Sequence, residues 1–149
     1  MHLTNYSINK QNDAFEQTDS DLNSAETGHK RSLTFALKYM QEKGHDVEKL
    51  MLEVKSMIIK TLIAVQPMLQ HTYRSCQPDD MENSMCFEIL GFDVMLDDKL
   101  RPYIIEINHD PSFETDSPLD FKVKRKLISD TLRLLNLNYY RRIKYKRQK

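Results

Sequence analysis

The sequence predicts an α+β fold in which antiparallel strands pack with helices. Residues 87–96 and 102–108 are two short apolar runs of the length of strands, and a polar turn at 97–99 separates them. Strands joined by so short a turn pair in antiparallel fashion. Apolar residues recur at helical spacing before this hairpin and again after it, which predicts helices in both places.

Two helices are expected ahead of the strands. The first runs from Lys30 to Lys43, and Gly44 is suited to the position just beyond a helix end. The positions that recur at helical spacing are Leu33, Leu37 and either Met40 or Gln41.

Asp46 is placed to cap the second helix, and Pro67 is expected to end or bend it, with a continuation to Tyr73 left open. A polar loop at 77–84 follows. One broad apolar stripe, expected to be buried, is formed by Val47, Leu50, Val54, Met57, Ile58, Leu62 and Val65.

The last helix is expected to begin after a polar, proline-bearing loop that follows the second strand. Ser117 supplies a capping hydroxyl, Pro118 suits the first helical position, and Asp120 stands where a capping-box acid belongs. This helix is expected to be scaffold for the second strand. Its apolar face is expected to consist of Val123, Leu127, Thr131, Leu134 and Leu135.

A carboxylate and an amide two residues apart mark the second strand as a candidate metal site. Glu106 and Asn108 share one face of a regular strand, together with Ile104. The hairpin brings Asp93 beside Glu106, and Mg²⁺ favours such oxygen ligands. The alternative is that Glu106 and Asn108 form only the solvated face of a strand. The opposite face, expected to be buried, carries Tyr103, Ile105 and Ile107.

Several separate motifs resemble one family of enzymes. The strings CFEILGFD at 86–93, IEINH at 105–109, PSF at 111–113 and TDS at 115–117 are similar to the end of the catalytic domain in the tubulin tyrosine ligase-like family. The segment HLTNYSIN at 2–9 resembles an earlier segment of the same domain. The likeness is greatest to the polyglutamylase branch, and residues 1–137 can be placed within it.

The resemblance implies that the chain is a fragment, namely the C-terminal portion of an ATP-grasp fold. It implies an enzyme that uses ATP and Mg²⁺ to join free glutamate to glutamate side chains of tubulin. The family's Mg²⁺ positions match Asp93, Glu106 and Asn108, with Glu106 as the catalytic residue and Asn108 also near the nucleotide. Thr4 and Asn5 match a segment lining the nucleotide cleft, although polarity at a turn or a strand end explains them equally well.

The 149 residues have zero net charge, but the charges are unevenly distributed. Residues 11–29 are acidic and polar, which predicts a flexible loop, whereas residues 138–149 form a basic tail. The tail suits the acidic C-terminal tails of tubulin in microtubules, and the family context disfavours nucleic acid. A solvated helix end is the alternative reading of the tail.

No apolar run is long enough for a membrane span, and two cysteines in a presumed reducing compartment are expected to be free and partly buried. The resemblance implies location in the cytoplasm and on the cytoskeleton, with microtubules of the cilium and basal body included. Two other functions stay open. One is an inactive remnant that acts as a microtubule-binding module, and the other is a tubulin glycylase.

Overall fold

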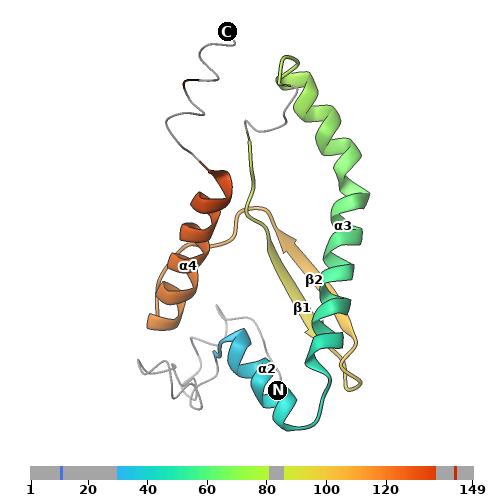
Figure 1. The fold of residues 1–149 in the computed structure, drawn as a ribbon, viewed down its shortest axis with the longest axis vertical. Coiled ribbons are helices and arrows are strands. Elements are labelled where there is room, and N and C mark those ends of the chain that lie inside the picture. The colour runs from blue at the N-terminus through green and yellow to red at the C-terminus, as the bar shows by residue number, and fades with distance from the viewer. Residues whose placement is uncertain (1–10, 12–29, 81–85, 137–142, 144–149) are drawn as a thin grey trace. The chain divides into compact units, whose positions relative to one another are not determined.

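The computed structural model describes residues 11, 30–80, 86–136 and 143, and their architecture is α+β, as predicted (Figure 1). The described elements are α2 (Leu33–Glu42), α3 (Val47–Cys76), β1 (Gly91–Leu96), β2 (Pro102–Asn108) and α4 (Pro118–Leu135). The two strands form one antiparallel sheet. Thr4, Asn5, the acidic segment 12–29 and almost all of the basic tail lie outside the described residues.

The chain divides into two compact units. One consists of residues 1–36 and 113–149, and the other of residues 37–112. The second unit contains the whole of α3 and the hairpin, so the candidate metal site lies entirely within it.

The ends of α2 follow from short-range hydrogen bonds. The Ser32 hydroxyl accepts a hydrogen bond from the Phe35 amide at 3.1 Å, so the helix begins three residues later than Lys30. At the other end Gly44 has φ of +85°, and the His45 amide donates to the Met40 carbonyl at 3.0 Å. A left-handed glycine with this bond is a common helix stop, and it confirms the predicted role of Gly44.

α3 begins at the predicted cap and continues past Pro67. The Asp46 carboxylate accepts a hydrogen bond from the Lys49 amide at 2.9 Å. Pro67 lies inside the helix, which runs on to Cys76, so of the two expected alternatives, an end or a bend, an end is excluded. The proline removes one amide donor, but the turns on both sides keep their own bonds. The continuation to Tyr73 is confirmed.

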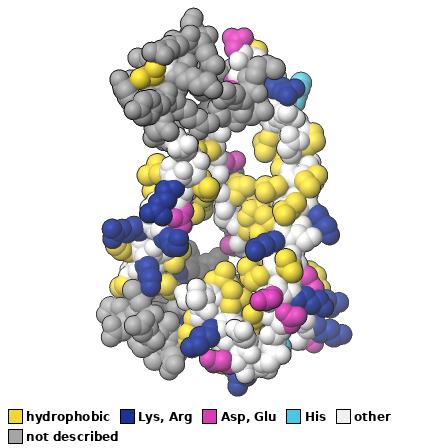
Figure 2. All heavy atoms as spheres, viewed as in Figure 1, with side chains coloured by type: hydrophobic (Ala, Val, Ile, Leu, Met, Phe, Trp, Pro, Cys, Tyr) yellow, Lys and Arg dark blue, Asp and Glu magenta, His cyan; other side chains and the backbone are white. Residues whose placement is uncertain are grey.

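The predicted apolar stripe of α3 is only partly covered. Leu50 is the one apolar side chain in the described ranges that is fully buried, at 5% exposed. Its helical neighbours on the same side are half-buried, and α3 contacts β2 there. Leu62 is exposed, contrary to prediction. Leu52, Ile59 and Ile63 of α3 are exposed as well. Figure 2 shows hydrophobic side chains on the surface of the molecule.

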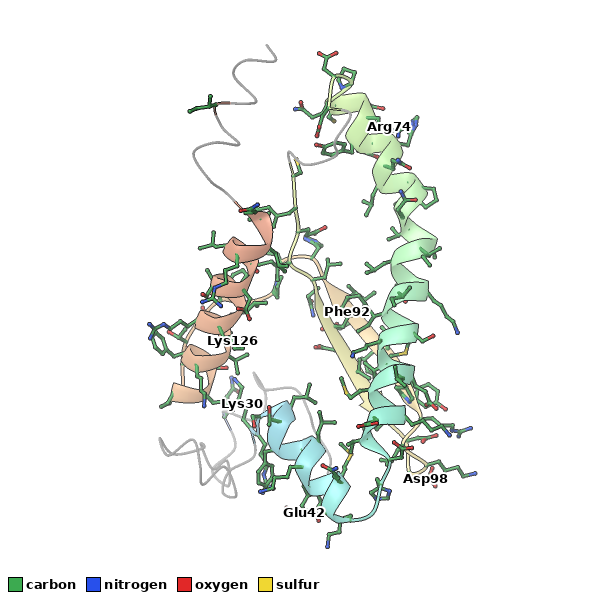
Figure 3. The ribbon with its side chains drawn as sticks, in the orientation of Figure 1. Lys30, Glu42, Arg74, Phe92, Asp98 and Lys126 are labelled. Atoms are coloured by element: carbon green, nitrogen blue, oxygen red, sulfur yellow. The ribbon has the colours of Figure 1, made fainter. Side chains whose placement is uncertain are left out.

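α4 begins with a small buried polar cluster. The Ser117 hydroxyl accepts from the Asp120 amide at 3.2 Å and donates to the Asp120 carboxylate at 2.8 Å. The Lys30 ammonium (Figure 3) forms an ion pair with the same carboxylate at 2.7 Å. The predicted cap at Ser117 is therefore confirmed. In a capping box the Asp120 carboxylate would accept a hydrogen bond from the Ser117 amide, whereas here it accepts from the Ser117 hydroxyl and pairs with Lys30.

The apolar face predicted for α4 is not a buried one. Val123, Leu127 and Leu134 are exposed, and Thr131 and Leu135 are half-buried. The buried side of the helix start is instead the polar cluster around Asp120.

The sequence predicts no membrane span, and it predicts free cysteines. Within the described part of the chain, none of the helices combines the length and apolarity required to cross a bilayer. Cys76 and Cys86 are free, as predicted, but both are exposed.

Asp120 makes stability depend on pH. Burial alone would raise its pKa, but hydrogen bonds from Lys30 and Ser117, with the positive charges of Lys30 and Lys124, outweigh burial and lower the pKa. A lowered pKa stabilises the fold above the unfolded value of about 3.9, and the contribution is lost as pH falls through the folded value.

We therefore expect Asp120→Asn to lower the free energy of unfolding by roughly 1 kcal/mol at pH 7. The difference between the variant and the wild type should shrink as pH falls below about 4, and it should vanish only below the lowered folded-state pKa, where Asp120 is protonated in both states of the wild type. Denaturant titrations between pH 2 and 7 measure this, with the exposed turn variant Asp98→Asn as control. A constant difference at all pH values would contradict the assignment.

Candidate metal site on the hairpin

The register of the hairpin brings the three predicted oxygen donors to one face. Asp93 of β1 lies opposite Glu106 of β2, and Gly91 lies opposite Asn108. Residues opposite each other in an antiparallel pair point to the same side of the sheet. Asp93, Glu106 and Asn108 therefore share a face, as the sequence predicts.

The turn that fixes this register is built around Asp97. Its carboxylate accepts hydrogen bonds from the Lys99 amide at 2.9 Å and from the Arg101 amide at 2.8 Å, and it pairs with the Arg101 side chain at 2.6 Å. Partial burial alone would raise the pKa of Asp97, but these bonds outweigh it and lower the pKa. Leu100 has φ of +59°, the left-handed position of the turn. One carboxylate thus holds both ends of the loop together.

A β-bulge separates the site from the rest of the sheet. Asp93 pairs with Glu106 and the next residue, Val94, pairs with Ile104, so Ile105 has no partner. The extra residue breaks the alternation of faces. Ile104 therefore lies with Val94 on the opposite face from Glu106, which corrects the prediction that the two share a face.

The predicted burial of the second apolar face is also wrong. Tyr103, Ile105 and Ile107 are exposed. Because of the bulge, Tyr103 falls on the same side as Glu106, and Ile105 is displaced from the pairing. The half-buried side of the hairpin is formed by Phe92 (Figure 3), Val94, Leu96, Pro102 and Ile104.

The donors interact directly. The Asn108 side-chain amide donates a hydrogen bond to Glu106 Oε1 at 3.2 Å, which fixes the orientation of the amide. Burial raises the pKa of Asp93, and a hydrogen bond with Glu106 and the negative charge of Glu106 raise it further. Two carboxylates placed side by side repel each other unless a proton or a cation lies between them.

This donor set fits Mg²⁺. Two carboxylates and an amide oxygen are hard ligands, and Mg²⁺ is commonly held by one or two carboxylates, with water and substrate phosphates completing its shell. In the ranges that the structure covers, no group of three or more His, Cys, Asp and Glu side chains is placed to hold a metal. The three donors on the hairpin are two carboxylates and one amide. None of the three is a thiolate or an imidazole, the ligands typical of zinc.

Sequence reasoning missed the role of Gly91 in this site. A β-carbon built on Gly91 would lie 3.2 Å from Pro111 Cβ and 3.6 Å from Asn108 Cβ. The signal was present, because a glycine inside a strand often marks a place where another part of the backbone comes close.

The chain belongs to the tubulin-tyrosine ligase family, since the model of that family matches residues 1–143. This match confirms the resemblance to the family that the sequence motifs indicate. The match includes both strands of the hairpin and all three donors.

Relatives are also found among characterised proteins. The chain is 53% identical over 136 residues to a "Probable beta-tubulin polyglutamylase" of Tetrahymena thermophila, covering 91% of this chain and 11% of the relative. It is 49% identical over 137 residues to "Tubulin polyglutamylase ttll6" of Danio rerio, covering 92% and 17%. For "Tubulin polyglutamylase TTLL6" of Homo sapiens the identity is 47%, covering 92% and 15%. The chain thus spans less than a fifth of these relatives.

Repulsion between Asp93 and Glu106 predicts that the substitution Asp93→Asn changes stability in opposite directions without and with a divalent cation. Without divalent cation, Asp93→Asn should raise the free energy of unfolding by up to about 1 kcal/mol, because it removes one of two adjacent like charges. With millimolar Mg²⁺ present, the variant should lose the stabilisation that the cation gives the wild type. Thermal unfolding in chelator and in Mg²⁺ measures both effects.

The matched control is Asp98→Asn, an exposed aspartate in the neighbouring turn. It should respond to Mg²⁺ as the wild type does. If Asp93→Asn is destabilising in chelator, the two carboxylates do not repel each other in the folded chain.

Proposed function

We propose that residues 1–137 are the C-terminal part of an ATP-grasp catalytic domain in an ATP-dependent tubulin polyglutamylase. The reaction is the amide ligation of free glutamate to glutamate side chains of tubulin. Membership of the tubulin-tyrosine ligase family and the printed names of the relatives support this.

The single observation that carries the proposal is the convergence of Asp93, Glu106 and Asn108 on one face of the hairpin. Ligation driven by ATP builds negative charge on phosphoryl oxygens, and bound Mg²⁺ supplies the counter-charge that stabilises it. The protein's task is to hold the ligands rigidly. The cross-strand pair and the Asn108–Glu106 hydrogen bond meet that requirement.

Each predicted site residue has a role in this proposal. Glu106 lies between the other two donors, since it pairs with Asp93 and accepts from Asn108. We assign Mg²⁺ to these three residues, with Glu106 as the catalytic member and Asn108 also facing ATP. Thr4 and Asn5 are proposed to bind near the phosphates on the strength of the motif at 2–9.

The basic tail at 138–149 is proposed to contact the substrate, because its charge suits the acidic tails of tubulin. The acidic and polar segment 11–29 is proposed to be a spacer. The proposed site of action is the cytoplasm and the cytoskeleton, with microtubules of the cilium and basal body included.

The decisive variant is Glu106→Gln, which keeps the size of the side chain and removes its charge. It should reduce ATP-dependent incorporation of radiolabelled glutamate into microtubules by at least about a hundredfold, because transition-state charge is left uncompensated. The assay uses the longest form of the protein that contains this chain, since the matched relatives are several times longer. Circular dichroism checks that the variant is folded.

The matched control is Glu53→Gln, at an exposed position of α3 away from the hairpin, and it should keep full activity. Retained activity in Glu106→Gln would remove Glu106 from its role. Labelled glycine in a parallel reaction tests the glycylase alternative. Microtubule binding without incorporation of either amino acid by the wild type would favour the inactive binding module.

A further inference from the structure

The loop after β2 comes back to the hairpin at Gly91. Gly91 is the partner of Asn108 at the open end of the pair. A β-carbon on Gly91 would lie 3.2 Å from Pro111 Cβ, 3.6 Å from Asn108 Cβ and 3.9 Å from the Asn108 carbonyl oxygen. The first of these distances is shorter than ordinary van der Waals contact between carbon atoms.

The need for glycine here is spatial. Gly44 has φ of +85° with open space around it, whereas Gly91 lies in a strand and has no positive φ. An L-amino acid could therefore adopt the backbone of Gly91. A side chain here would crowd Pro111, which would have to move by a few tenths of an ångström to make room for a β-carbon.

The contact matters because of what lies between the two residues. Asn108 is the last residue of β2, and Pro111 follows three residues later. Pro111 lies against Gly91, and the proline ring fixes the φ angle of Pro111. The Asn108 side chain is half-buried at this point and donates to Glu106 Oε1 at 3.2 Å. Because only two residues separate Asn108 from Pro111, a shift of Pro111 away from β1 would act on the backbone next to Asn108.

We propose that Gly91 is a positioning residue for the metal site. Its missing side chain lets Pro111 pack against β1, and this packing holds the Asn108 amide beside Glu106. The importance of that orientation for ligation rests on the proposed function, while the packing itself can be tested without it.

The test uses Mn²⁺ as a paramagnetic substitute for Mg²⁺, with binding followed by electron paramagnetic resonance. Gly91→Ala should weaken Mn²⁺ binding roughly 10- to 100-fold, the range seen when groups that orient metal ligands are altered. In the ligation assay the same variant should need a correspondingly higher Mg²⁺ concentration. Circular dichroism monitors folding throughout.

Rescue separates positioning from simple loss of stability. Pro111→Gly removes the β-carbon that a new side chain at position 91 would meet. Adding Gly91→Ala to Pro111→Gly should therefore change Mn²⁺ affinity less than about threefold, whereas adding it to the wild type causes the full loss. Val94→Ala, on the other face of β1, should lower stability and leave Mn²⁺ affinity unchanged.

The outcomes separate the positioning role of Gly91 from the existence of the metal site. Wild-type affinity in folded Gly91→Ala, or an equal loss in the Pro111→Gly background, overturns the positioning role. If Gly91→Ala alone is unfolded and the double variant is folded and binds Mn²⁺, the contact is supported. If the wild type binds Mn²⁺ no better than Glu106→Gln, the proposed metal site itself fails, and the positioning role with it.

Discussion

The register of β1 against β2 sets the positions of all three oxygen donors. Asp93 and Glu106 are neighbours only because they are directly opposed, and a shift by one residue would move Glu106 to the other face of the sheet. Two features hold the register. Asp97 closes the turn through the backbone and side chain of Arg101, and the bulge at Ile105 absorbs one residue between the turn and the site.

The bulge also divides the hairpin into two parts with different tasks. Near the turn, Val94 and Ile104 pair on the half-buried side of the hairpin, where apolar side chains pack. Beyond the bulge, Asp93 and Glu106 pair on the other side and carry the charge. A regular strand would have aligned Ile104 with Glu106. The extra residue changes the partner of Val94, which is Ile104 where a regular pair would place Ile105.

Local chemistry explains why much of the fold was predictable from sequence. The caps at Asp46 and Ser117 and the stop at Gly44 depend on neighbours a few residues away, and the pairing of Asp93 with Glu106 follows from the short turn between the strands. All four are confirmed. The bulge at Ile105 and the contact of Gly91 with Pro111 were missed, because they depend on how the strands meet in space. The burial predicted for Leu62 and Tyr103 failed because periodicity indicates an apolar face without showing what covers it. If residues 1–137 are one part of a larger catalytic domain, as proposed, other parts of that domain would supply the cover.

The central claim is that Asp93, Glu106 and Asn108 together bind a divalent cation. Nuclear magnetic resonance of the isotopically labelled protein during a Mn²⁺ titration tests it most directly, because the paramagnetic ion broadens signals only of nuclei close to it. The account predicts that the signals of these three residues and of Gly91 disappear first, and that they persist in Glu106→Gln. Broadening that begins in the acidic segment 11–29, with the hairpin signals unchanged, would contradict it.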